Sequence, residues 1–87
     1  MASQLDGKVV IVTGSSGGLG ESIALTCASR GASVTICGRD EARLKSVLEK
    51  AVEISGGHSD RFLTVQGDLN DRLVRKQIIE QTVKKFG

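Results

Sequence analysis

Hydrophobic residues gather in three short runs, and each run is followed by a longer segment in which apolar residues recur at helical spacing. The short runs predict β-strands at Lys8–Thr13, Ser33–Cys37 and Arg61–Gln66. The longer segments predict helices over Gly18–Arg30, from the cap Asp40 to about Ile54, and from Asn70 or Asp71 to about Phe86. The first run is apolar without interruption between two glycines, which predicts a strand buried on both faces.

The apolar positions of each predicted helix share one face, as expected for helices that cover a sheet. These positions are Ile23, Ala24, Cys27 and Ala28; Leu44, Val47, Leu48 and Ala51; and Val74, Ile78, Ile79 and Val83. The resulting β-α-β-α-β-α order predicts the α/β class, with a parallel sheet that forms half of a doubly wound fold, strand order 3-2-1. The first strand would then keep an unpaired edge, so we expect residues 1–87 to be the N-terminal part of a longer protein.

A glycine-rich loop, Thr13-Gly-Ser-Ser-Gly-Gly-Leu-Gly20, joins the first strand to the first helix. Glycines let the backbone approach a phosphate, and the free N–H groups of the helix start point at it. Leu19 and Gly20 stand where a P-loop would carry its second glycine and its lysine. The loop therefore predicts a Rossmann-type pyrophosphate site, with an ordinary tight turn as the alternative.

The segment Thr13–Gly20 resembles the Thr-Gly-x3-Gly-x-Gly motif of the short-chain dehydrogenase/reductase family. Leu5–Val9 and Gly67–Leu69 are similar to two further segments of that family, so the resemblance covers nearly the whole chain. It implies that the loop glycines accept the pyrophosphate, that Ser16 and the Leu19 backbone bond cofactor oxygens, and that Thr13 is structural. The implied loop contacts are Gly14, Ser15, Ser16, Gly17, Gly18, Leu19 and Gly20.

The end of the second predicted strand bears on which cofactor is preferred. A carboxylate there binds a ribose 2′-hydroxyl, whereas an arginine accommodates a 2′-phosphate. Gly38 stands where NAD-preferring members of the family carry an acid, and Arg39 follows it. We therefore predict NADP(H) over NAD(H), with a merely solvent-exposed Arg39 as the alternative. Asp40 is expected to cap the next helix.

Asp68 and Leu69 follow the third predicted strand. The family resemblance implies that the Asp68 carboxylate accepts a hydrogen bond from the adenine amino group. It also implies that the Leu69 backbone N–H meets the adenine ring. The alternative is that Asp68 only caps the following helix.

The chain contains no tyrosine. The family transfers hydride between a nicotinamide and an alcohol or carbonyl carbon, and uses a Tyr-x3-Lys pair for the proton, so no catalytic residue is assigned. The resemblance implies the NADP(H)-binding portion of such an oxidoreductase, a partial domain over 1–87. The alternatives are a short, non-catalytic nucleotide-binding or partner-pairing module, and a methyltransferase-like site.

Charge and cysteine content exclude some classes of partner. A net charge of +2 is too small to indicate nucleic acid, and the two cysteines match no zinc pattern or disulfide framework. The single histidine, His58, is expected in a solvated loop, and no metal site is predicted. No signal peptide or membrane span is predicted, which favours a reducing, cytoplasmic compartment. Expected partners are the dinucleotide, an alcohol or carbonyl substrate only in a full-length protein, and a second copy in a homo-oligomer.

Overall fold

The computed structural model describes residues 4–14 and 18–87, and its elements alternate as the sequence predicts. The three strands are β1 (Val9–Val12), β2 (Ser33–Gly38) and β3 (Phe62–Gln66). The helices are α1 (Gly18–Ser29), α2 (Glu41–Ile54) and α3 (Arg72–Phe86), and a short 3-10 helix, η1 (Ser59–Arg61), precedes β3. Every predicted strand and helix is present, and no end differs from its predicted position by more than two residues.

Local sequence signals account for several of these boundaries. Gly31 follows α1 with φ +91°, a left-handed conformation that ends a helix and that glycine adopts without steric cost. Asp40 caps α2 by accepting a hydrogen bond from the Arg43 backbone N–H at 3.2 Å, as predicted. Of the two candidates for the cap of α3, Asp71 is the one observed, and it accepts from the Leu73 N–H at 2.9 Å.

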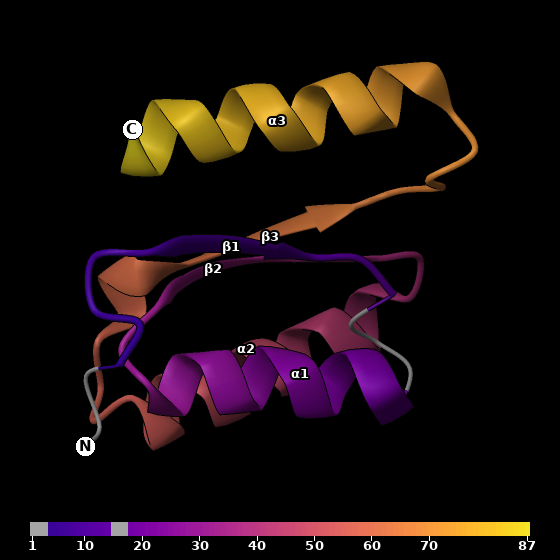
Figure 1. Cartoon of the computed structure of the whole chain (residues 1–87). Coiled ribbons are helices and arrows are strands. Elements are labelled where there is room, and N and C mark those ends of the chain that lie inside the picture. Colours follow the sequence, from indigo (N-terminus) through magenta and orange to yellow (C-terminus); the bar gives the residue numbers. More distant parts are fainter. Residues whose placement is uncertain (1–3, 15–17) are drawn as a thin grey trace.

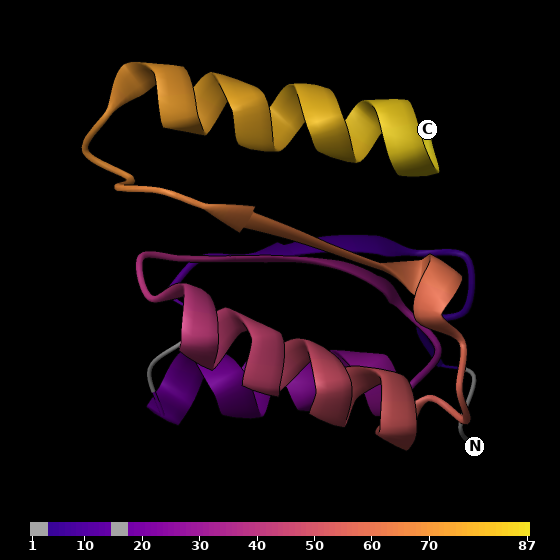
Figure 2. The same ribbon diagram turned by 180° about the vertical axis from the view of Figure 1, so that it is seen from behind.

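The three strands form one parallel sheet, in which β2 lies between β1 and β3 (Figure 1). The order is β1-β2-β3 rather than 3-2-1 as written above, although the neighbours are the same when the sheet is read from the other edge. Helices α1 and α2 cover one face, and α3 covers the other (Figures 1 and 2). This three-layer arrangement is a Rossmann-like α/β fold.

Alternate residues of β2 divide the core into two parts. Val34 and Ile36 are buried against α1 and α2, in a cluster that also contains Ala24, Ala28, Leu44, Val47 and Ala51. Cys37 faces the other side and packs with Val65 of β3 and Ile78 of α3. Thr35 shares that side, and its hydroxyl lies 2.7 Å from the hydroxyl of Thr82, so a buried hydrogen bond joins β2 to α3.

The prediction that β1 is buried on both faces is wrong for this chain. Val12 is buried, but Val9 is 44% exposed and Ile11 37% exposed. Their β2 partners in the register are Ser33 and Thr35, which places both side chains on the α3 side of the sheet. Helix α3 packs on β2 and β3 and leaves this part of β1 uncovered.

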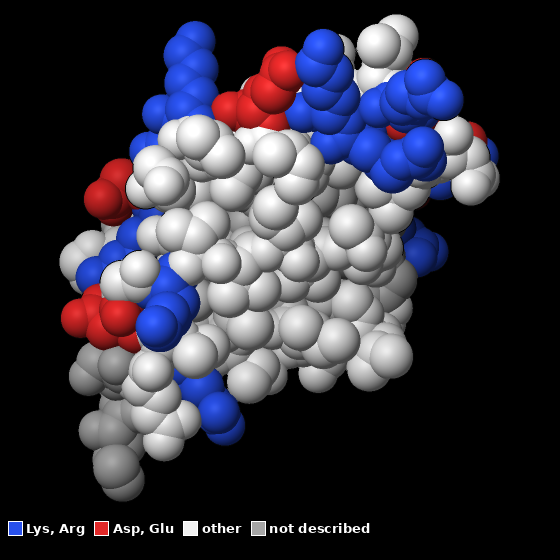
Figure 3. All heavy atoms as spheres, turned by 45° about the horizontal axis from the view of Figure 1, so that its top comes forward, with Lys and Arg blue, Asp and Glu red and all other residues white. Residues whose placement is uncertain are grey.

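Some apolar positions of the helices are also exposed, contrary to the single buried faces that their spacing predicts. Ile79 and Val83 of α3 are more than half exposed, and Ile23 of α1 is nearly so. Figure 3, in which the α3 side of Figure 1 is turned forward, shows a broad area without charged side chains, bordered above mainly by Lys and Arg with some acidic side chains among them. Helical spacing identifies apolar positions, but which of them are covered depends on the neighbouring elements.

Candidate nucleotide site

The carboxyl ends of the three strands bring the predicted contact residues to one edge of the sheet. Gly14 follows β1, Arg39 follows β2 and Asp68 follows β3, because parallel strands end on the same side. A hollow of about 280 Å³ opens at this edge, and the residues that line it are Gly14, Gly38, Arg39, Gly67, Asp68, Leu69 and Asn70. Residues far apart in the sequence therefore meet at one concave surface.

Helix α1 begins beside the turn that follows β1. Gly14 has φ +70°, a conformation that favours glycine, and a Cβ atom there would meet nothing within 4 Å. Gly18, Leu19 and Gly20 form the first turn of α1, whose backbone N–H groups have no partner within the helix. Leu19 is exposed. This first turn can attract an anion. The predicted contacts Ser15, Ser16 and Gly17 lie outside the described residues.

Arg39 and Asp68 both line the hollow and form an ion pair. Arg39 Nη2 is 3.8 Å from Asp68 Oδ2, and the two side chains are 77% and 45% exposed. The guanidinium is therefore open to solvent and to a ligand. Gly38, at the end of β2, presents no carboxylate that would compete for the same position.

A compact turn holds the Asp68 side chain. Its Oδ1 accepts from the Asn70 N–H at 2.9 Å, and its backbone carbonyl accepts from the Asp71 N–H at 2.9 Å. Asp68 therefore does not cap α3, because Asp71 does. Arg75 of α3 donates from Nη1 to the Leu69 carbonyl at 2.6 Å and ties the turn to the helix. One Asp68 oxygen, Oδ2, is directed toward Arg39.

The residues at the end of β3 lie close to both β2 and α3. The Gly67 N–H donates to the Gly38 carbonyl at 2.9 Å and continues the ladder one step beyond β3. A Cβ atom on Gly67 would lie 2.8 Å from both methyl carbons of Val74, so α3 approaches this point closely only because residue 67 is glycine. Gln66 adds a side-chain bond from Nε2 to the Arg39 carbonyl, at 3.2 Å.

Sequence reasoning did not identify Gln66, Asn70 or Arg75 as part of this site. The Gln66 bond depends on how β3 lies beside β2, and the Arg75 bond depends on how α3 lies beside the turn that follows β3; no local motif in the sequence specifies either arrangement. A local signal was available for Asn70, because an aspartate side chain commonly accepts a hydrogen bond from the backbone N–H two residues later in the chain.

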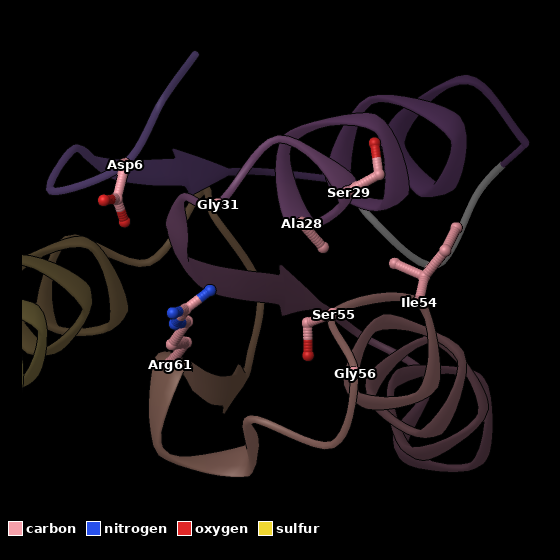
Figure 4. Close-up of a pocket in the computed structure, with 8 residues that line it drawn as sticks. All are labelled: Asp6, Ala28, Ser29, Gly31, Ile54, Ser55, Gly56 and Arg61. Carbon is pink, nitrogen blue, oxygen red and sulfur yellow. The ribbon is translucent and has the colours of Figure 1, made fainter. Parts of the chain in front are cut away.

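A second hollow, of about 410 Å³, lies at the opposite edge of the sheet (Figure 4). The side chains of Asp6 and Arg61 point toward this space, and Ser29 and Ser55 come from the last turn and the end cap of α1 and α2 (Figure 4). Helix carboxyl ends carry partial negative charge, and Asp6 offsets the charge of Arg61. This hollow is therefore a poor site for a phosphate.

Outside these two hollows, the described residues offer few groups that could take part in catalysis or bind a metal. Burial raises the pKa of the Cys37 thiol to about 11, so Cys37 is a neutral thiol at physiological pH and a poor nucleophile. His58 lies in an exposed loop. Across residues 4–14 and 18–87, no three His, Cys, Asp or Glu side chains are grouped so that they could hold a metal ion. The helices in the same ranges are all too short or too polar to cross a bilayer.

The model of the short chain dehydrogenase family matches residues 8–87. Among curated proteins, 11-beta-hydroxysteroid dehydrogenase-like 4A of Arabidopsis thaliana is 36% identical over 86 residues. The match covers 99% of this chain but 28% of the relative, so the chain spans less than a third of that protein's length.

Solved structures show the same fold. A short-chain dehydrogenase/reductase of unknown function from Caenorhabditis elegans, determined with cofactor, superposes with a TM-score of 0.91 at 37% identity, over 95% of this chain and 30% of that one. The L-sorbose reductase of Gluconobacter frateurii, complexed with NADPH and L-sorbose, superposes with a TM-score of 0.87 at 31% identity. That match covers 100% of this chain and 32% of the reductase.

Proposed function

This chain belongs to the short-chain dehydrogenase family, and from that premise we propose that it binds NADP(H) in preference to NAD(H). The pyrophosphate would lie against the glycine-rich loop and the start of α1, and the adenosine would lie in the hollow that Arg39 and Asp68 help to line. In this arrangement the guanidinium of Arg39 binds the 2′-phosphate, and the Asp68–Leu69 turn meets the adenine.

The observation that carries the proposal is the place of Arg39 beside a strand end without a carboxylate. A ribose 2′-hydroxyl needs an acceptor at the end of β2, and Gly38 supplies no side chain there. A 2′-phosphate needs donors, and the exposed guanidinium of Arg39 offers several in a planar fork. The chemistry of the edge therefore favours the phosphorylated cofactor.

The reaction of the whole protein follows from the family. When bound, NADPH supplies a hydride to a carbonyl carbon, and NADP⁺ accepts a hydride from the carbon of an alcohol. These 87 residues include no tyrosine, so they do not contain the residue that the family uses for proton transfer. We assign them the task of binding and orienting the adenosine and pyrophosphate parts of the cofactor, within an oxidoreductase.

Backbone NMR of the isotope-labelled protein, titrated with NADPH, tests where the cofactor binds. The expected shifts are confined to the carboxyl edge of the sheet, at Gly14, Gly18–Gly20, Arg39 and Asp68–Asn70. Residues of the opposite hollow, such as Ser55 and Arg61, serve as an internal control and should not shift. Shifts centred on that hollow, or none at saturating NADPH, would overturn the proposal.

A further inference from the structure

Gln66 is the last residue of β3, and it pairs in the parallel register with Gly38 of β2. Its side chain lies on the α2 side of the sheet, where it lines a hollow with Glu41, Leu44 and Lys45 of α2. From there its amide Nε2 reaches across the end of β2 and donates to the Arg39 carbonyl oxygen at 3.2 Å. An exposed side chain of one strand thus holds the backbone of the residue that follows the next strand.

This bond acts on a short segment that is fixed at both ends. On one side, the Gly38 carbonyl accepts from the Gly67 N–H at 2.9 Å, so the sheet holds the chain just before Arg39. On the other side, Asp40 is fixed as the cap of α2. The peptide group between Arg39 and Asp40 lies between the hydrogen-bond ladder of the sheet and the cap of α2. The Gln66 amide donates to the carbonyl oxygen of that peptide group.

The orientation of that peptide determines where the Arg39 side chain begins. With its carbonyl held on the α2 side, the guanidinium lies at the hollow and within 3.8 Å of Asp68. Arg39 has several rotatable bonds and is largely exposed, so little else restricts it. Holding the backbone reduces the ordering that a bound phosphate must impose on the arginine.

We propose that Gln66 is a positioning residue for cofactor discrimination: its amide fixes the Arg39 backbone so that the guanidinium meets a ribose 2′-phosphate. The inference rests on the proposed function, because it concerns the preference of that same site. Gln66 acts through Arg39, and it is expected to affect the 2′-phosphorylated cofactor alone. NADH, which has a hydroxyl at that position, gains nothing from Arg39 and should be indifferent to Gln66.

The test compares Gln66→Met with Gln77→Met in the full protein chain. Methionine keeps the length and unbranched shape of glutamine and removes its N–H donor. Gln77 is an exposed glutamine of α3 and serves as the matched control. Calorimetric titration gives the dissociation constants for NADPH and NADH, and thermal unfolding is recorded for each variant. Wild type and Arg39→Ala are measured alongside.

Gln66→Met is expected to weaken NADPH binding by about threefold to tenfold, the usual cost of ordering one side chain with several rotatable bonds. The NADH constant and the unfolding temperature should be unchanged, and Gln77→Met should match wild type. Equal weakening of both cofactors, or an unchanged NADPH constant, would overturn the inference. If wild type itself shows no preference, or Arg39→Ala retains it, the proposed function fails instead, so the two failures are distinguishable.

Discussion

The guanidinium of Arg39 and the carboxylate of Asp68 lie 3.8 Å apart, in the lining of the hollow at the carboxyl edge of the sheet. Both residues were predicted from the sequence as contacts of one adenosine, Arg39 at its 2′-phosphate and Asp68 at its adenine. In the structure they are each other's partners. Because the Arg39 side chain is largely exposed and that of Asp68 nearly half exposed, the pair contributes only about 0–1 kcal/mol, and a phosphate can compete for Arg39 at little cost.

Arg39→Ala should therefore leave the fold nearly as stable as before. Loss of an exposed ion pair is expected to change the free energy of unfolding by less than about 1 kcal/mol. Urea unfolding followed by circular dichroism measures this change, with Arg61→Ala as a control for the loss of one positive charge. A loss of more than about 2 kcal/mol would show that Arg39 is structural and would remove the reason for assigning it to the cofactor.

Gly67→Ala should destabilise the protein, because its Cβ would lie 2.8 Å from both methyl carbons of Val74. Valine is stiff at χ1 and cannot easily turn its methyl groups away, so a cost of about 1–3 kcal/mol is expected. Gly18→Ala is the control, since a Cβ there meets nothing within 4 Å.

The same clash can be relieved from the other side. In a Val74→Ala background, Gly67→Ala should cost much less than in wild type, because the two methyl carbons are gone. Denaturant unfolding of the four proteins of this cycle gives the coupling. An equal cost of Gly67→Ala in both backgrounds would contradict the close approach of α3 to residue 67.

The hydroxyls of Thr35 and Thr82 predict an asymmetry between two substitutions. Thr82 donates its proton to the Ile78 carbonyl at 2.6 Å, which leaves Thr35 as the donor in the bond of 2.7 Å between the two hydroxyls. Thr82→Val leaves the buried Thr35 hydroxyl without its hydrogen-bond acceptor and should lower the free energy of unfolding by about 1–3 kcal/mol. Thr35→Val leaves Thr82 bonded to Ile78 and should cost less.

Urea unfolding of both single variants and of the double variant checks this order. The double variant should be more stable than Thr82→Val alone, because it has no unpaired buried hydroxyl. The account of how α3 is held to β2 is incorrect if Thr35→Val proves the more damaging change.

The buried thiol of Cys37 predicts a loss of stability at high pH. Its pKa is raised to about 11 in the folded protein, while a thiol in an unfolded chain has a pKa of about 8.5. Between these values the folded state keeps a proton that the unfolded state has lost, so stability falls as pH rises. Below about pH 8.5 the contribution is complete.

Unfolding free energies between pH 7 and pH 10 measure this effect. The quantity to compare is the difference between wild type and Cys37→Ala, because every other ionisable group is common to the two proteins. Wild type should lose stability faster than Cys37→Ala above about pH 8.5. Parallel curves for wild type and Cys37→Ala would show that the thiol is not held neutral.

The order and nature of the elements could be predicted because their signals are local. The apolar run before the glycine-rich loop, the cap at Asp40 and the glycine at position 31 each act within a few residues. That Arg39 and Asp68 lie at the same edge agrees with one further rule, that parallel strands end on the same side of a sheet, whereas the role predicted for Asp68 came from the family resemblance. These steps need no knowledge of side-chain packing.

What could not be predicted depends on which elements lie beside each other. The exposure of Val9 and Ile11 reflects the placement of α3 over β2 and β3, and the spacing of apolar residues in β1 carries no information on that. The contact of Gln66 with the Arg39 carbonyl likewise joins positions 27 residues apart. Such contacts arise from tertiary geometry and were found only in the structure.

The preference for the 2′-phosphorylated cofactor is the central claim, and its direct test is the ratio of the NADH and NADPH dissociation constants. Isothermal titration of wild type and Arg39→Ala with both cofactors gives this ratio. We expect wild type to bind NADPH more tightly by about 10- to 100-fold, the worth of hydrogen bonds to a charged group, and Arg39→Ala to bind both alike. Equal affinity of wild type for the two cofactors, or a preference that survives Arg39→Ala, would contradict the account.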